Sequence, residues 1–167
     1  FGTGSHETTS SCMEALACFV KEGDRVLDVG CGSGILSIAA LLCGASEALG
    51  IDIDPNAARV AKENAALNSF PGRFDALAGN ILDEDRDPVL KDALCDQVYD
   101  LVVANIVADV IIPLSGQIRR HLKPGGYFIT SGILAPRAEE VRAALEQNGF
   151  TVCETKQKKE WVCYVAR

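Results

Sequence analysis

The sequence predicts an α/β fold in which a mostly parallel β-sheet is covered by helices on both faces. Three observations lead to this prediction. Apolar strand patterns alternate with helical patterns along the chain, which is typical of parallel sheets. A glycine-rich turn joins the first predicted strand to the helix that follows it. The last two predicted strands have no helix between them, so we expect an antiparallel hairpin at the sheet edge.

The first elements form a strand–helix–strand unit. Residues 25–29 (RVLDV) are apolar and β-branched, so they are expected to form a buried strand. After the glycine-rich turn, residues 35–42 form a predicted helix of small and aliphatic residues that ends near Gly44. Residues 48–53 are expected to form the second strand of the parallel sheet.

Capping residues locate the next helix. Asp54 suits the N-cap and Pro55 the first helical position, so a helix is predicted from there to about Asn68. A third strand is expected at residues 74–78. The residues of this helix that are expected to be buried are Val60, Ala61, Ala65 and Leu67.

The second half of the chain continues the alternation. The charged residues 83–87 are expected to form a solvated turn, and residues 101–104 (LVVA) a buried strand. A helix is predicted at 113–122, because the sequence Lys-Pro-Gly-Gly at 123–126 is a strong stop signal. A fifth strand follows at 127–131.

The C-terminal elements complete the prediction. An amphipathic helix is expected at 136–148, closed by Gly149, and strands at 151–154 and 161–166. The 167 residues suit a single domain. The chain begins without methionine in a Gly/Ser/Thr-rich stretch, so we expect it to be a fragment whose natural N-terminal part is missing.

Composition excludes several classes of function. A net charge of −7 argues against binding to a nucleic-acid backbone, and no apolar run is long enough to span a membrane. The seven cysteines include no C-x-x-C pair, so no metal site is expected. We interpret them as buried, free thiols in the reducing cytoplasm. A monomer is the default expectation.

The sharpest motif is the loop DVGCGSG, which follows a strand and opens a helix. Asp28 lies two residues before the first of the alternating glycines Gly30, Gly32 and Gly34. Such a loop lets a ligand approach the backbone closely. Asp52, about 20 residues further on at a strand end, can accept both ribose hydroxyls. The spacing G-x-G-x-G favours S-adenosylmethionine over NAD, whose fingerprint is G-x-G-x-x-G, and over a purely structural turn.

Asn80 is a weaker candidate for the same site. It follows the third predicted strand, so it could lie beside an adenine ring. Its alternative role as a simple turn residue is equally compatible with the sequence.

Five segments together resemble one family. They are FGTGSHETT, VLDVGCGSGILSIAA, GIDIDP, VVANIVAD and LKPGGYFITSGIL, and they resemble the catalytic domain of the PrmA family, the methyltransferases of ribosomal protein L11. The resemblance covers essentially the whole chain. Glu7 and Val107 depart from the family's usual proline and leucine, which affects the substrate side more than the cofactor site.

The resemblance implies a fold, a cofactor and a substrate. The fold is the Rossmann-like class I methyltransferase fold, a seven-stranded sheet with an antiparallel edge hairpin. Residues 1–167 are then one catalytic domain, and the family's N-terminal substrate-recognition domain is absent. Cofactor contacts fall on Thr9, Gly30, Asp52 and Asn105. The implied reaction is transfer of methyl groups from S-adenosylmethionine to lysine or α-amino nitrogens of ribosomal protein L11.

Methyl transfer from a sulfonium is an in-line displacement, so the enzyme mainly aligns the reactants. Asn105 ends a predicted strand where the amine should approach. We hypothesise that it orients the amine, and the alternative is a cofactor contact alone. Three other functions remain open: methylation of another protein or of a small molecule, and cofactor binding without turnover. An amide methyltransferase would carry N-P-P-Y in place of Ala-Asn-Ile.

Four further residues are expected to have mainly structural roles. His6 lies in a polar loop, where a structural role is favoured over contact with the cofactor or substrate. His121 is expected to interact with a helix dipole. Trp161 is expected to pack in the core or at the edge, with a wall of the substrate pocket as the alternative. Asp109 is expected to be a solvated acid at a helix start, with attraction of a cationic substrate as its alternative.

Overall fold

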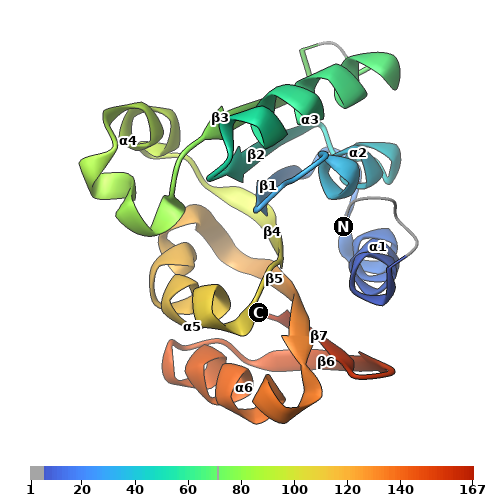
Figure 1. The fold of residues 1–167 in the computed structure, drawn as a ribbon, viewed down its shortest axis with the longest axis vertical. Helices are drawn as coiled ribbons and strands as arrows, with labels where there is room; N and C mark the ends of the chain where they lie inside the picture. The colour runs from blue at the N-terminus through green and yellow to red at the C-terminus, as the bar shows by residue number, and fades with distance from the viewer. Residues whose placement is uncertain (1–5, 71) are drawn as a thin grey trace.

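Seven strands form one sheet in the computed structural model, which describes residues 6–70 and 72–167 (Figure 1). The order is β3-β2-β1-β4-β5-β7-β6, and β7 is antiparallel to both of its neighbours while all the other pairs are parallel. The predicted seven-stranded, mostly parallel sheet with an antiparallel edge hairpin is therefore confirmed. The strands are β1 (Arg25–Val29), β2 (Glu47–Asp52), β3 (Phe74–Ala78), β4 (Tyr99–Asn105), β5 (Leu122–Leu134), β6 (Val152–Lys158) and β7 (Trp161–Ala166).

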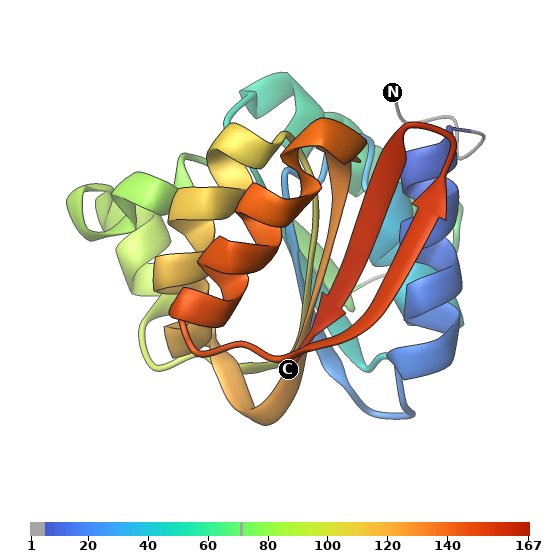
Figure 2. The ribbon, with the colours of Figure 1, turned by 90° about the horizontal axis from the view of Figure 1, so that it is seen from below.

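Helices cover both faces of the sheet, as Figure 2 shows with the sheet seen nearly edge-on. One layer contains α1 (Glu7–Phe19), α2 (Ile35–Leu42) and α3 (Pro55–Leu67), and the other contains α4 (Pro88–Leu94), α5 (Ala108–Gln117) and α6 (Ala138–Gln147). Three short 3₁₀ segments complete the described elements: η1 (Ile81–Arg86), η2 (Ile118–His121) and η3 (Ala135–Arg137).

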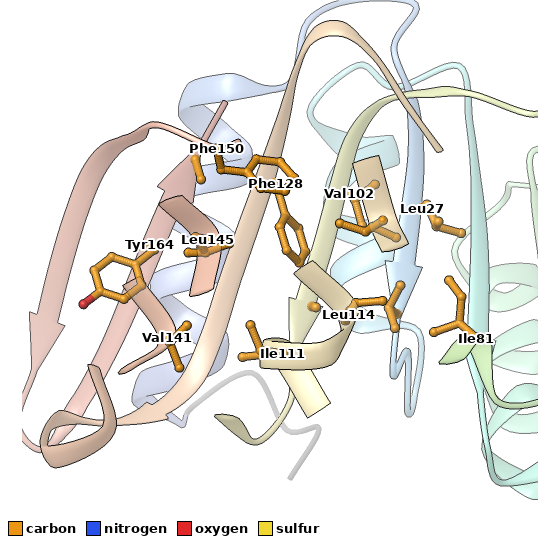
Figure 3. Packing of buried hydrophobic residues seen from close by; sticks show 14 of the residues in the cluster. Leu27, Ile81, Val102, Ile111, Leu114, Phe128, Val141, Leu145, Phe150 and Tyr164 are labelled. Carbon is orange, nitrogen blue, oxygen red and sulfur yellow. The ribbon is translucent and has the colours of Figure 1, made fainter. Parts of the chain in front are cut away.

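The central strands are apolar on both sides because each side packs against a helical layer. Leu27 and Val102 face the α5/α6 layer, where they join Leu114, Phe128 and Tyr164 in one core (Figure 3). A second core lies between the opposite face and α1 and α2. Burial on this scale, at roughly 25 cal/mol per Å² of apolar surface, is the main stabilising term.

The topology creates a ligand site at one edge of the sheet. Strand β1 pairs with β2 on one side and with β4 on the other. The connections after β1 and β4 therefore leave in opposite directions, and a crevice opens beyond the carboxyl ends of these strands.

Capping occurs where the sequence predicts it. Asp54 caps α3, because its Oδ1 accepts a hydrogen bond from the Asn56 N–H at 2.9 Å. Helix α6 ends before Gly149, which adopts φ +84°. Helix α5 and η2 end before the Lys-Pro-Gly-Gly sequence, although this sequence belongs to β5 rather than to a loop.

Helices occupy two segments where none is predicted. Residues Glu7–Phe19 form α1, whose buried residues include Cys12, Ala15 and Leu16 at helical spacing. The segment 83–87, expected to be a solvated turn, belongs mostly to η1 and is followed by α4. The expectation was wrong because Glu84, one of its acidic residues, is buried rather than solvated.

The start of α5 and the buried residues of α3 also differ from the prediction. The helix predicted at 113–122 begins five residues earlier as α5, with Pro113 inside it. Leu67 is 83% exposed and Val60 is only partly buried, whereas Ala58 takes a buried place on α3. Helix α3 packs through alanines, and at Ala61 the close approach of Gly34 leaves little room for a larger side chain.

The cysteines are only partly as expected. All seven lie in described residues and have free thiols. Four of them are exposed, so the prediction of seven buried thiols was wrong for Cys18, Cys43, Cys95 and Cys153. None of the helices in the described ranges combines the length and apolarity that a membrane span requires.

Candidate functional site

Two adjoining pockets lie at the carboxyl ends of the central strands and share Gly30. The larger, of about 370 Å³, is lined on its polar side by Asp52 and Asn80 and otherwise mainly by aliphatic side chains. The smaller, of about 160 Å³, is lined by Thr9, Asn105 and the glycine loop. Together they form one cleft, in which the larger pocket is mainly aliphatic and the smaller one carries the Thr9 and Asn105 side chains.

A larger hollow of about 480 Å³ lies at the opposite ends of the strands. It lacks a glycine loop, and the guanidinium groups of its two arginines already interact with other protein groups. The Arg25 guanidinium interacts with Glu47 and Gln97, and that of Arg73 donates to backbone carbonyls. We therefore assign the functional site to the cleft at Gly30.

The glycine loop is fixed to the end of β2. The N–H groups of Gly30 and Cys31 both donate to the Ile51 carbonyl, at 2.8 and 3.1 Å. Gly30 adopts φ +74°, and a Cβ there would lie 2.4 Å from Ile106 Cγ2. Gly32 also has positive φ, but no described atom lies within 4 Å of where its Cβ would be. The loop is thus rigid at Gly30 and open at Gly32, where a ligand can lie against the backbone.

Asp52 links the loop to the next helix. One carboxylate oxygen accepts the Gly32 N–H at 2.8 Å, and the other accepts the Asp54 N–H at 2.9 Å. Each oxygen can accept a second hydrogen bond. The residue lines the larger pocket, so the carboxylate is held in place as an acceptor for hydroxyl groups of a ligand.

Asp28 lies beneath the loop, and neither pocket includes it among its described lining residues. Its Oδ2 accepts hydrogen bonds from the N–H and the hydroxyl of Ser37, at 3.1 and 2.7 Å. Its Oδ1 has no partner among the described residues. Burial raises the pKa of Asp28 to about 6. Its observed contacts connect β1 to the first turn of α2.

Gly34 likewise lies outside the described lining of both pockets. It caps α2 with φ +79°, and its N–H closes the loop by donating to the Cys31 carbonyl at 2.8 Å. Its role in this structure is to start the helix and to let α3 approach.

Asn80 serves locally as a cap and also lines the larger pocket. Its Oδ1 accepts the Leu82 N–H at 3.1 Å, and its Nδ2 donates to Asp83 at 3.0 Å. The capping contacts agree with the role as a turn residue, and the position beside an adenine ring stays a prediction.

Thr9 and Asn105 meet across the smaller pocket although they are 96 residues apart. The Asn105 Nδ2 donates to the Thr9 Oγ1 at 3.3 Å. Thr9 is 2% exposed on α1, and Asn105 ends β4. Of the predicted site residues, the structure thus brings Thr9, Gly30, Gly32, Asp52, Asn80 and Asn105 to one cleft.

Several aliphatic residues of the cleft were not singled out from the sequence. Ile53 directly follows Asp52 and is 76% exposed, which is unusual for a large apolar residue. An apolar residue after a strand-end acid is a signal that could have revealed it. The other aliphatic residues of the larger pocket are Val29, Ile51, Ile81, Leu82, Ile106 and Val110.

The remaining candidates have structural contacts. His6 caps α1 by accepting the Thr8 N–H at 3.3 Å, and its ring lies edge-on to Trp161 at 5.4 Å. Asp109 lies in the first turn of α5 with its side chain 77% exposed, as expected of a solvated acid, and it pairs with Arg137 at 2.9 Å. The predicted segment before His6, residues 1–5, lies outside the described residues.

His121 differs from its predicted role. It is 4% exposed, and its Nε2 lies 2.8 Å from a carboxylate oxygen of Glu84. A buried carboxylate partner, rather than a helix dipole, is its main contact. Among the described residues, no group of three or more His, Cys, Asp and Glu is placed to hold a metal ion.

Comparisons with known proteins agree on one family. A family model described as "Ribosomal protein L11 methyltransferase (PrmA)" matches residues 1–167. The protein of that name from Lachnospira eligens is 48% identical over 169 residues, covering all of this chain and 52% of the relative. One from Clostridium botulinum is 46% identical, covering all of this chain and 50% of the relative. The chain spans about half the length of these curated relatives.

Solved structures give the same result for the fold. A ribosomal protein L11 methylase from Lactobacillus delbrueckii subsp. bulgaricus has a TM-score of 0.87 at 32% identity, covering 98% of this chain and 80% of that one. An RNA methyltransferase from Salinibacter ruber, solved with S-adenosyl-L-homocysteine, has a TM-score of 0.68 at 20% identity, covering 96% and 90%. The second similarity concerns the fold alone.

Proposed function

The chain belongs to the ribosomal protein L11 methyltransferase (PrmA) family, and we propose that it binds S-adenosylmethionine in the two pockets and methylates amines of ribosomal protein L11. The observation that carries the proposal is the cleft at Gly30, with Asp52 in its larger, aliphatic pocket and the Thr9–Asn105 pair in its smaller pocket.

The residues present suit this cofactor. The aliphatic lining of the larger pocket matches an adenine ring, and the spare acceptor sites of Asp52 match two ribose hydroxyls. Gly32 gives the amino-acid part of the cofactor open access to the backbone. In this proposal Thr9, Gly30 and Asn105 surround the part of the cleft nearest to the sulfonium.

When bound, the cofactor supplies a methyl group that is already activated for displacement. The protein must then align an amine with it, which is a matter of proximity and orientation. Asn105 is suited to this task because its Nδ2 is taken by Thr9, whereas its Oδ1 forms no hydrogen bond with a described residue. In the proposed mechanism Oδ1 accepts a hydrogen bond from the amine and orients its lone pair.

The proposal extends to the context of the reaction. Since the chain spans about half of its relatives, we assign catalysis to residues 1–167 and recognition of the ribosomal protein to a domain outside them. We also propose that the protein works in the cytoplasm as a monomer. The net charge of −7 suits an acidic enzyme that acts on a basic protein rather than on a nucleic acid.

Calorimetric titration with S-adenosylhomocysteine tests the cofactor site. We expect wild-type protein to bind it and Asp52→Ala to lose at least about tenfold in affinity, because hydrogen bonds to a carboxylate contribute roughly 1.5–3 kcal/mol. Asp54→Ala is the matched control, since it removes a nearby acid that only caps α3. Binding of NAD instead, or equal losses in both variants, would contradict the proposal.

A turnover assay with purified ribosomal protein L11 tests the role of Asn105. Asn105→Ala should lower kcat by about tenfold or more, because a misaligned nucleophile reacts slowly. Affinity for S-adenosylhomocysteine should change much less. Retention of full turnover would restrict Asn105 to a cofactor contact. Methylation of only another protein or a small molecule, or binding without turnover, would replace the proposed substrate or activity.

A further inference from the structure

Gly132, which lies outside both pockets, is packed against the segment that carries Asn105. It adopts φ +83°, and a Cβ there would lie 2.6 Å from the Ile106 carbonyl oxygen and 3.1 Å from the Ile106 nitrogen. These are backbone atoms, which cannot move aside as the end of a flexible side chain can. Only glycine therefore lets β5 approach the Ile106 peptide this closely.

The approach is produced by an irregularity in β5. The pairing of β5 with β7 shifts register between Thr130 and Ile133. On its other side β5 stays paired with β4 as far as Asn105, opposite Ser131, and the Ser131 carbonyl accepts the Ile106 N–H at 3.1 Å. Irregularities of this kind commonly redirect a strand beside a functional site.

Ile106 is held from its other side by the glycine loop. Its Cγ2 lies only 2.4 Å from the position that a Cβ of Gly30 would occupy. The backbone of Ile106 thus contacts Gly132 while its side chain contacts Gly30. A residue held between two such glycines has little room to move toward either one.

The held segment connects the two pockets of the cleft. The Ile106 side chain lines the larger pocket, and the neighbouring Asn105 lines the smaller one and donates to Thr9. A displacement of Ile106 away from β5 would therefore move Asn105 relative to Gly30, which both pockets share.

We propose, on the basis of the proposed methyl transfer, that Gly132 is a positioning residue: it admits the Ile106 peptide against β5 and thereby fixes the Asn105 amide for the reaction. A misplacement of about 1 Å can lower a rate by roughly 100-fold. Binding of the cofactor depends mainly on Asp52 and the glycine loop, so it should be less sensitive to this displacement.

The test compares Gly132→Ala with Gly23→Ala in the full-length protein. Gly23 has φ +86°, but no described atom lies within 4 Å of its Cβ position. Both variants therefore strain a left-handed residue, and only Gly132→Ala collides with a backbone. We expect Gly132→Ala to lower kcat on ribosomal protein L11 by at least tenfold, with less than about a threefold change in the Kd of S-adenosylhomocysteine. Gly23→Ala should leave kcat within about twofold.

Two further readouts separate positioning from general damage. The NMR signals of the Asn105 side-chain amide should shift in Gly132→Ala and not in Gly23→Ala, whether or not turnover is detected. Ile106→Ala removes the contact with Gly30 and so frees the segment on that side. The loss of kcat in the Gly132→Ala/Ile106→Ala double variant should therefore be smaller than the product of the losses in the two single variants. If Gly132→Ala does not fold, the comparison is made in the Ile106→Ala background.

The outcomes are distinguishable. Equal kcat values for Gly132→Ala and Gly23→Ala, or unchanged Asn105 signals, overturn the inference. So does a loss of S-adenosylhomocysteine affinity as large as the loss of kcat, because Gly132 would then only shape the cofactor pocket. In the Ile106→Ala background, Asn105 signals that Gly132→Ala leaves unchanged have the same meaning. Wild-type protein that neither binds S-adenosylhomocysteine nor transfers methyl groups instead refutes the proposed function, and the NMR comparison then decides the positioning role alone.

Discussion

Asp28 is a carboxylate that is buried in an unfavourable environment beneath the glycine loop. The side chain is 1% exposed, and Ser37 satisfies only one of its two carboxylate oxygens. Removal from water favours the neutral acid, so the pKa rises despite the two hydrogen bonds from Ser37, which lower it. The glycine loop is therefore supported at some cost to stability at neutral pH.

We predict that Asp28→Asn changes how stability depends on pH. The folded-state pKa of about 6 exceeds the ordinary value of 3.8, so the stability that Asp28 contributes is present below about pH 4 and is lost as pH rises through 6. Relative to Asp28→Asn, the wild type should lose up to about 3 kcal/mol between these limits. Urea unfolding at pH 4 to 7 without cofactor measures this difference.

Ser37→Ala provides the control for this prediction. It removes both hydrogen bonds that oppose the effect of burial, so the wild-type pH dependence should become steeper in this variant. A stability difference between Asp28→Asn and wild type that stays constant from pH 4 to 7 would show that Asp28 does not titrate in this range.

At the scale of elements, η1 combines an irregular backbone at Asp83 with a buried acidic side chain. Glu84 of η1 is 6% exposed, and its Oε2 lies 2.7 Å from the Arg120 guanidinium and 2.8 Å from the His121 ring. Since η1 also carries Ile81 and Leu82, this contact with η2 holds the aliphatic wall of the larger pocket.

Glu84→Gln should therefore loosen η1. The neutral amide is a poorer partner for Arg120 and His121, and weakening a buried polar contact typically costs about 1–3 kcal/mol. Faster hydrogen exchange across η1 and a reduced affinity for S-adenosylhomocysteine should accompany the lower stability. Asp85→Asn is the matched control, because Asp85 contacts the same arginine from an exposed position and such pairs contribute about 1 kcal/mol or less. Equal effects of the two substitutions would contradict the anchoring role.

At the scale of the whole molecule, the cleft lies where the two helical layers diverge. Thr9 comes from the α1 layer, Asn105 from the centre of the sheet, and η1 from the opposite layer. In the proposed function these residues form the cofactor site, whereas the chain covers only about half of the length of its relatives. We therefore expect that cofactor binding and recognition of a protein substrate can be separated.

We predict that residues 1–167 alone bind S-adenosylhomocysteine with an affinity close to that of the full-length protein. Their turnover on ribosomal protein L11 should be much lower, because the contacts that concentrate the substrate at the cleft are lost. Calorimetry and a methyl-transfer assay on both proteins measure the two quantities. Full activity of the shorter chain would place substrate recognition within these residues.

The sequence by itself determined the parts of this protein that depend on local chemistry. The strand at 25–29, the glycine loop, the cap at Asp54 and the helix stop at Gly149 are each specified by neighbouring residues, because backbone conformation and capping act over a few positions. The fold class followed from the order of such elements. Helix α1 also carries a local signal in the spacing of Cys12, Ala15 and Leu16, but the polar residues before it obscured its beginning.

Only the tertiary structure decided which distant residues meet. The contact of Asn105 with Thr9, the burial of Glu84 against His121 and the position of Ile106 between Gly30 and Gly132 join segments between 26 and 96 residues apart. Exposure was decided in the same way, since Leu67 has a helical position compatible with burial but no neighbouring element covers it. Packing between elements is a property of the assembled layers, and no local pattern in the chain specifies it.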